Sequence, residues 1–344
     1  MSGLDLADDW VWDFWVVDDP AAANADEHFH AFFLHAPRSL GDPDLRHEHA
    51  RVGHAVSRDL TDWRVLAAAL HPQTAPAFDD LATWTGSTVH AEALGGWWMF
   101  TSGITHATGT RVQRIGVSRS ADLITWTRTS GTVMELDPRW YVDQVADDPG
   151  SPTAETHWRD PFVVADPTVA GLWHAYITAK TPHPQTAEPT GAIAHATSYD
   201  LESWEVGPPL DVEPGRFDQL EVISLDRVDG RWVLIFSVLG AQVPGAEPGE
   251  GGVWSVPVAG PGAPVDTRLA TRLTSERLYV GRTVRLRDGS SRFLAFVNED
   301  HRDPVGPFVG GLTPPLRVGW RTDGAGLRLL DAPDHWLPVR AGLG

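Results

Sequence analysis

Three acidic side chains stand in apolar or aromatic surroundings in this sequence. Asp13 lies within Trp-Val-Trp-Asp-Phe-Trp, Asp160 within Trp-Arg-Asp-Pro-Phe, and Glu221 within Phe-Asp-Gln-Leu-Glu-Val-Ile. A carboxylate among apolar side chains is costly unless it is paired or takes part in chemistry. Two carboxylates beside an arginine suit glycoside chemistry, in which one attacks or activates water and the other, with a raised pKa, protonates the leaving oxygen. Each acid taken alone is also compatible with an ordinary carboxylate at a strand end or turn.

The elements that must position these acids are predicted to be strands. Short apolar or alternating runs recur about every ten to fifteen residues, and Gly, Pro, Asp and Asn clusters separate them. The string Ser-x-Asp-Leu-x-x-Trp occurs at 57–63, 120–126 and 198–204, each time after an apolar run. Ser and Asp side chains bind backbone groups in turns, so each copy predicts a hairpin. We expect the three closing tryptophans to pack between neighbouring sheets.

A second repeat consists of bulky strands. Five of them occur, at 28–33, 97–100, 172–176, 231–236 and 291–296. Their spacing of roughly 60 residues predicts five blades of about four strands each, which is an all-β, five-bladed β-propeller. A β-sandwich is the alternative, but it would not account for three near-identical turns. We therefore predict a single domain over residues 1–344, without a C-terminal β-sandwich.

Composition excludes several other classes of protein. The 344 residues contain no cysteine, which excludes disulfides, thiolate metal sites and cysteine nucleophiles. The net charge of −19 repels phosphate backbones, so we expect no nucleic-acid partner. No apolar run approaches the ~20 residues of a membrane span, and the first residues lack the features of a signal peptide, so we expect a cytoplasmic protein. The sequence leaves the oligomeric state open.

The histidines give no metal-binding pattern. His-Glu-His at 47–49 lacks two further ligands at a recognisable spacing, so we interpret it as a solvated loop. Chemistry by two carboxylates needs neither a metal nor an organic cofactor, and we expect none.

Taken together, the acidic segments resemble those of the fructosyl-transferring propellers, glycoside hydrolase families 32 and 68. Residues 11–15, Val-Trp-Asp-Phe-Trp, are similar to the levansucrase nucleophile segment, and Trp-Thr-Gly-Ser at 84–87 resembles a segment that lines the sugar pocket. Arg-Asp-Pro at 159–161 matches a family motif, and Asp-Gln-Leu-Glu at 218–221 resembles the stretch that carries the acid/base. Residues 310–316 resemble a late segment of invertase-type enzymes, and all these motifs occur in family order.

The resemblance implies roles for the three acids. Asp13 would be the nucleophile that forms a covalent fructosyl-enzyme, and Glu221 would protonate the leaving oxygen and then activate water or an acceptor sugar. Asp160 would bind sugar hydroxyls and stabilise the oxocarbenium-like transition state. We expect further residues beside these acids or near the pocket to bind a small carbohydrate: Trp12, Trp15, Trp84, Ser87, Arg159, Asp218 and Arg282.

The sequence departs from the family patterns at several positions. The invertase-type Trp-x-Asn-Asp-Pro-Asn-Gly is absent, and Thr85 and Gln219 stand where levansucrases usually carry Ser and Glu, which weighs against a polymerising activity. The favoured function is a retaining glycosidase, with transglycosylation open, on β-fructofuranosides such as sucrose or short fructo-oligosaccharides. Two alternatives stay open: an inverting arabinofuranosidase or xylosidase, as in the more distant family 43, and a non-catalytic sugar-binding propeller.

Overall fold

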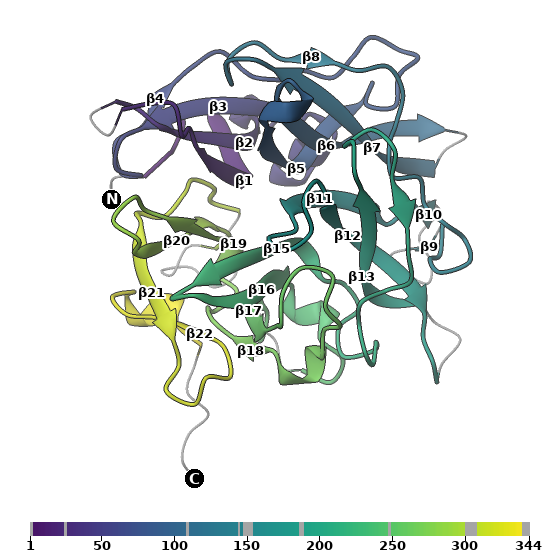
Figure 1. Cartoon of the computed structure of the whole chain (residues 1–344), viewed down its shortest axis with the longest axis vertical. Helices are drawn as coiled ribbons and strands as arrows, with labels where there is room; N and C mark the ends of the chain where they lie inside the picture. Colours follow the sequence, from purple (N-terminus) through teal and green to yellow (C-terminus); the bar gives the residue numbers. More distant parts are fainter. Residues whose placement is uncertain are drawn as a thin grey trace.

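Five β-sheets surround a common axis in this protein (Figure 1). The computed structural model describes residues 3–23, 26–107, 110–143, 145–146, 154–185, 189–246, 249–299 and 308–338. The predicted all-β, five-bladed β-propeller is confirmed, and the β-sandwich alternative is excluded. The assignment of residues 1–344 to one domain stays a prediction.

Consecutive strands build each blade, and the first strand of each lies innermost. Blade 1 contains β1 (Asp9–Asp18), β2 (Phe29–Pro37), β3 (Arg51–Ser57) and β4 (Arg64–Val65). Blade 2 contains β5 (Ala82–Ala91), β6 (Gly96–Ala107), β7 (Thr110–Ser120) and β8 (Thr127–Arg128), with β9 (Val145–Ala146) and β10 (Ala154–Glu155) added at β7. Blade 3 contains β11 (Trp158–Ala165), β12 (Trp173–Pro182), β13 (Pro189–Ser198) and β14 (Glu205–Val206).

The last two blades follow the same order. Blade 4 contains β15 (Glu221–Val228), β16 (Arg231–Val238), β17 (Gly252–Pro257) and β18 (Thr271–Arg272). Blade 5 contains β19 (Leu278–Arg285), β20 (Ser291–Val297), β21 (Leu316–Trp320) and β22 (Leu327–Leu329). Short 3₁₀ helices complete the described residues: η1 (Arg38–Leu40), η2 (Pro43–Glu48), η3 (Glu92–Leu94), η4 (Gly240–Gln242), η5 (Thr267–Leu269) and η6 (Asp334–Trp336).

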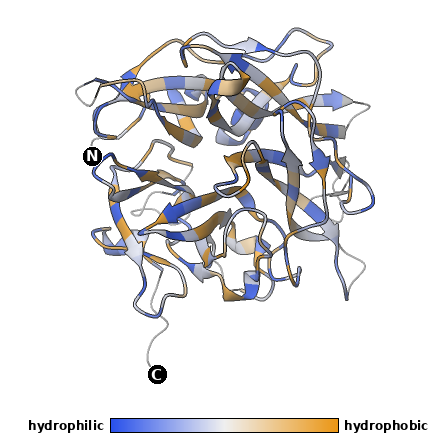
Figure 2. Cartoon of the chain, viewed as in Figure 1, coloured by the Kyte–Doolittle hydropathy of each residue, from blue (hydrophilic) through white to orange (hydrophobic). Residues whose placement is uncertain are grey.

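The five bulky runs are the second strands of the five blades. Each contributes a fully buried aromatic ring, namely Phe32, Phe100, Tyr176, Phe236 and Phe293. An aromatic side chain removes about 150–250 Å² from water, so these strands supply much of the core of each blade. Hydrophobic and hydrophilic segments alternate within the blades, as sheets packed face to face require (Figure 2).

The repeated Ser-x-Asp-Leu-x-x-Trp string forms a turn between the third and fourth strands of blades 1, 2 and 3. In the first copy, Ser57 Oγ accepts from the Leu60 N–H at 3.0 Å, and Asp59 Oδ1 accepts from the next two backbone N–H groups. Leu60 has a positive φ of 66° there, and the leucines of the other two copies, Leu123 and Leu201, each have a similar φ of 63°. The predicted hairpin turns are therefore confirmed.

Two of the closing tryptophans pack onto the preceding blade. Trp126 of blade 2 meets Phe32 of blade 1 edge to face, with ring centroids 5.6 Å apart. Trp204 of blade 3 meets Phe100 of blade 2 in the same way at 5.7 Å. This repeated contact joins blade to blade, as predicted for these two residues.

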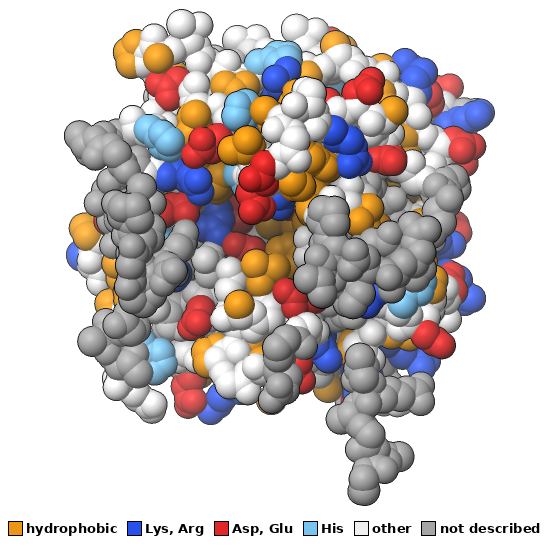
Figure 3. Space-filling model, turned by 180° about the vertical axis from the view of Figure 1, so that it is seen from behind, with side chains coloured by type: hydrophobic (Ala, Val, Ile, Leu, Met, Phe, Trp, Pro, Cys, Tyr) orange, Lys and Arg blue, Asp and Glu red, His pale blue; other side chains and the backbone are white. Residues whose placement is uncertain are grey.

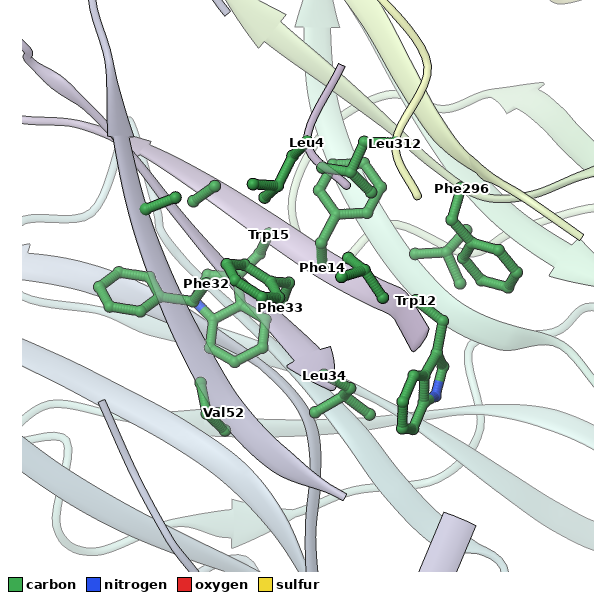
Figure 4. Close-up of a cluster of buried hydrophobic side chains, with 14 of the residues drawn as sticks. Leu4, Trp12, Phe14, Trp15, Phe32, Phe33, Leu34, Val52, Phe296 and Leu312 are labelled. Carbon is green, nitrogen blue, oxygen red and sulfur yellow. The ribbon is translucent and has the colours of Figure 1, made fainter. Parts of the chain in front are cut away.

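The propeller closes where blade 5 meets the start of the chain. The Gly311 N–H donates to the Val11 carbonyl, and the Leu312 N–H donates to the Leu4 carbonyl, both at 2.8 Å. Figure 4 shows Leu4, Leu312 and Phe14 in one cluster of buried side chains. The segment that resembles invertase-type enzymes thus helps to close the ring.

Among the described residues, no helix has the length and apolar character needed to cross a membrane. The cytoplasmic location stays a prediction.

Candidate active site

The inner strand of every blade carries a β-bulge near its beginning. The bulges lie between Trp12 and Phe14, Trp84 and Gly86, Arg159 and Phe162, Glu221 and Ser224, and Tyr279 and Arg282. An extra residue interrupts the alternation of a strand and redirects its side chains, and such bulges are common beside active sites. Three residues in these bulges, Asp160, Val222 and Val280, have positive φ angles of 59°, 50° and 51°. Strained backbone of this kind points to a functional constraint.

Residues at all five bulges line one cavity of about 790 Å³. The three predicted catalytic acids, Asp13, Asp160 and Glu221, all lie on its wall, although they belong to blades 1, 3 and 4. Four of the predicted binding residues also line it: Trp12, Trp84, Arg159 and Asp218. The face of the molecule in Figure 3 is hollowed near its middle, where acidic and basic side chains gather.

The Asp13 carboxyl is held by a neighbouring blade. The hydroxyl of Thr85, in the bulge of β5, donates to Asp13 Oδ2 at 2.5 Å. Burial, together with the nearby charge of Asp160, raises the pKa of Asp13 to about 7, although the Thr85 hydrogen bond opposes the rise.

Asp160 is almost completely buried and accepts several hydrogen bonds. Its Oδ2 atom accepts from the Thr178 hydroxyl at 3.0 Å and from the Val222 N–H at 3.3 Å, and Arg159 Nε lies 3.5 Å from it. Burial raises the pKa of Asp160 to about 6, and the Arg159 charge limits that rise. The Asp160 carboxylate is thus fixed between blades 3 and 4.

Both oxygens of Glu221 have a donor. Arg159 Nη2 donates to Oε1 at 2.5 Å, and the Tyr279 hydroxyl donates to Oε2 at 2.5 Å. Arg159 Nη2 also donates to Gln219 Oε1. Burial raises the pKa of Tyr279 well above its usual range, so its phenol stays protonated as a donor.

Two predicted binding residues are instead packed within or between blades. Trp15 is 3% exposed, lies in the buried cluster of Figure 4, and donates from Nε1 to Thr88 Oγ1 at 2.9 Å. Ser87 Oγ donates to the Pro161 carbonyl at 2.7 Å and accepts from the Val163 N–H at 2.9 Å. Neither residue lines the cavity, because Trp15 follows the Asp13 bulge into the core and Ser87 ties blade 2 to blade 3.

Arg282 also lies outside the cavity lining. Its guanidinium is buried behind the acids and donates to the backbone carbonyls of Phe14 and Ile223. The structure therefore places Arg282 on the backbone of β1 and β15 and not on the cavity wall.

Several residues of the cavity wall were not among the site residues predicted from the sequence. Arg46 and His47, both in η2, line the cavity together with Arg111, Lys180 and Tyr279. Burial, together with the charges of Arg46 and Arg111, lowers the pKa of His47 to about 3, so the imidazole is neutral.

The interpretation of 47–49 as a solvated loop is wrong for His47. Its carbonyl accepts a hydrogen bond from Trp84 Nε1 at 2.6 Å, which anchors η2 to the cavity wall. The only feature of the sequence that could have indicated Arg46 and His47 as cavity residues is the cluster of basic residues directly before the third strand of blade 1. Within the described ranges, no three His, Asp or Glu side chains are grouped so that they could hold a metal ion.

Comparison with known proteins identifies the family. The model of the glycosyl hydrolases family 32 N-terminal domain matches residues 13–251, so the chain belongs to this family. A search of curated protein sequences finds no significant match.

Solved structures share the fold. The sucrose-6-phosphate hydrolase from Lactobacillus gasseri superposes with a TM-score of 0.70 at 16% identity, covering 93% of this chain and 60% of that one. The inulosucrase from Halalkalicoccus jeotgali bound to kestose gives 0.66 at 20% identity, covering 94% and 87%. Fructan 1-exohydrolase IIa from Cichorium intybus gives 0.65 at 16%, covering 95% and 59%. This chain thus spans about three fifths of the length of the first and third of these proteins.

Proposed function

We propose that this protein is a retaining glycoside hydrolase that acts on β-fructofuranosides such as sucrose or short fructo-oligosaccharides. The observation that carries the proposal is the convergence of Asp13, Asp160 and Glu221, from three blades, on one cavity in a family 32 chain. The names of the similar structures, which include sucrose-6-phosphate hydrolase and fructan exohydrolase, support the substrate class.

In the proposed first step, Asp13 attacks the anomeric carbon of the fructosyl unit. The Thr85 hydroxyl holds Oδ2, which leaves Oδ1 as the attacking oxygen. Glu221 donates its proton to the leaving glycosidic oxygen, so the bond to the leaving group breaks as the bond to Asp13 forms. The product of this step is a covalent fructosyl-enzyme and a free alcohol, which is glucose when the substrate is sucrose.

In the second step, Glu221 acts as a base. It takes a proton from water, the water oxygen attacks the anomeric carbon, and Asp13 leaves as a carboxylate. An acceptor sugar in place of water would give transfer. Arg159 and Tyr279 orient the Glu221 carboxyl group, because each lies within hydrogen-bond distance of a different oxygen, and both donate to it once it has given up its proton.

Asp160 is proposed to stabilise the transition state. Its Oδ2 atom is already bonded to Thr178 and Val222, so Oδ1 is the oxygen that accepts from sugar hydroxyls. A fixed carboxylate near the developing positive charge of the sugar ring stabilises the transition state more than the ground state. Trp12 and Trp84, on the cavity wall, provide apolar faces for the sugar ring.

The test is turnover by the purified protein. Sucrose, sucrose 6-phosphate and 1-kestose are incubated separately with the wild type, with Asp13→Asn and with Asp62→Asn, an exposed acid in a turn, as the matched control. The proposal predicts release of fructose by the wild type and the control, and none by Asp13→Asn. A fructose yield below that of glucose from sucrose would indicate transfer. No release from any substrate contradicts the proposal and favours a sugar-binding propeller.

The stereochemistry of the product separates the proposal from an inverting glycosidase. Proton NMR at early times identifies the anomer first released. The proposal predicts β-fructofuranose, whereas α-fructofuranose would show inversion.

A further inference from the structure

The guanidinium of Arg282 joins inner strands that carry the catalytic acids. Arg282 lies on β19 and is 4% exposed. Its Nε donates to the Phe14 carbonyl on β1 at 3.2 Å, and its Nη1 donates to the Ile223 carbonyl on β15 at 3.1 Å. Its Cζ atom lies 5.4 Å from the ring centroid of Phe162 on β11.

Each of these contacts falls one or two residues after a catalytic acid in the sequence. Phe14 follows Asp13, and Ile223 and Phe162 each come two residues after their acids. Phe14 and Phe162 end the bulges of β1 and β11, and Ile223 lies within the bulge of β15. One side chain therefore connects the backbone of β1 and β15 at the points that aim the nucleophile and the acid/base.

We propose that Arg282 is a positioning residue for the reaction, which fixes the bulges that carry Asp13 and Glu221. This inference rests on the function proposed above. It assigns Arg282 no contact with the substrate, since the side chain does not line the cavity.

Carboxylates surround the Arg282 guanidinium and keep it charged where it is held. Three carboxylates interact with it, Asp226 on β15 most strongly, then Asp160 on β11 and Asp13 on β1. Burial lowers the pKa of Arg282 to about 10, so the guanidinium still carries its charge at neutral pH.

Asp13 faces other charges as well. Asp160 and Glu221 favour its protonated form, and Arg46 on the cavity wall favours the carboxylate. Arg282 is not among the main charges that act on Asp13, so its role rests on its two backbone hydrogen bonds.

Two substitutions separate geometry from charge. Arg282→Lys keeps a positive charge but cannot bond both carbonyls with a planar fork. Arg282→Met removes the charge and both hydrogen bonds while keeping a long apolar stem. Arg285→Met, at an exposed position on the same strand, is the matched control. For each protein, kcat, KM, the pH dependence of kcat/KM and the thermal unfolding midpoint are measured with the fructoside that the wild type hydrolyses.

The proposal predicts different results for the two variants. Arg282→Met should lower kcat about 100-fold, because small displacements of reacting groups are costly, with little change in KM. Arg282→Lys should lower kcat about 10-fold, because it keeps a donor but cannot reach both carbonyls, and it also serves as the test if Arg282→Met fails to fold.

The contrary outcomes are distinct. Wild-type kcat in a folded Arg282→Met protein, with only a lowered unfolding midpoint, would overturn this inference and leave the proposed function standing. Wild-type kcat in Arg282→Lys would show that the two hydrogen bonds of the guanidinium are not needed, and would overturn it as well. A wild type without turnover on any fructoside would overturn the proposed function, and this inference with it.

Discussion

Arg159 donates to Glu221 across 2.5 Å, and it does so from the position directly before Asp160. One dipeptide on β11 therefore supplies both the Asp160 carboxylate on the cavity wall and the cation that binds the Glu221 carboxylate of the next blade. The same Arg159 lies 3.5 Å from Asp160 through Nε. This arrangement gives a physical reason for the adjacent Arg and Asp, since both side chains line the same cavity from one strand.

Thr85 is predicted to set the ionisation of Asp13. Thr85→Val is nearly isosteric and removes the hydroxyl that donates to Asp13, whereas Thr85→Ser keeps it. Because that hydrogen bond lowers the pKa of Asp13, its loss should raise the pKa from about 7, and the acidic limb of kcat/KM should move upward by about one pH unit. Activity falls as pH drops through this limb, because attack needs the carboxylate. A limb that stays in place in Thr85→Val would refute the assignment of this limb to Asp13.

Ser87 is predicted to act on stability and not on substrate affinity. Ser87→Ala leaves the Val163 N–H and the Pro161 carbonyl without their partner between blades 2 and 3. Loss of such buried bonds costs about 1–3 kcal/mol of unfolding free energy. Denaturant unfolding and steady-state kinetics together check this. An unchanged stability with a raised KM would instead restore Ser87 to the substrate site.

The fold could be predicted from the sequence because its repeated features are local. The turn at Ser57, Asp59 and Leu60 depends on side chains within a few residues of one another, so it can be recognised without the rest of the chain. The bulky second strands are equally local. Their recurrence was sufficient to predict five blades, and the structure confirms both features.

The buried histidine pairs are predicted to make the protein acid-sensitive. His30 Nδ1 lies 2.9 Å from His54 Nε2, and His174 Nδ1 lies 2.9 Å from His195 Nε2, at corresponding places in blades 1 and 3. Burial lowers the pKa of His54 to about 3 and that of His195 to about 4. The folded pKa values lie below the unfolded value near 6.5, so the unfolded chain binds more protons in between.

The contribution of these neutral histidines to the stability of the fold is fully present above about pH 6.5. It is lost as the pH falls toward their pKa values in the folded protein. When the pH is lowered from 7 to 5, protonation of His54 and of His195 in the unfolded chain should each reduce the free energy of unfolding by about 2 kcal/mol. Urea unfolding at the two pH values measures this, with His54→Gln and His195→Gln expected to reduce the difference and the exposed His71→Gln expected to preserve it. Equal pH dependence in all four proteins would exclude the histidine pairs as its cause.

The candidate site was harder to predict because it depends on long-range geometry. Asp13, Asp160 and Glu221 could be singled out, since acids in apolar segments are costly wherever they fall. Regular alternation would put Trp12 and Trp15 on opposite faces of the strand, but the bulge at Asp13 places them opposite Leu34 and Phe32, on one face. Only the fold shows that Trp12 reaches the cavity and that Trp15 lies in the core. No sequence motif marks Tyr279, and only the three-dimensional structure shows that it lines the cavity.

The most direct test of the account is to trap the covalent intermediate. Glu221→Gln is incubated with an aryl β-fructofuranoside, whose leaving group needs no proton from Glu221, and the protein is then digested for mass spectrometry. The account predicts that one hexosyl unit accumulates on the peptide that carries Asp13, and that the doubly substituted Asp13→Asn, Glu221→Gln protein shows none. Rapid release of the aryl group with no labelled peptide, or a label on a different carboxylate, would contradict Asp13 as the nucleophile.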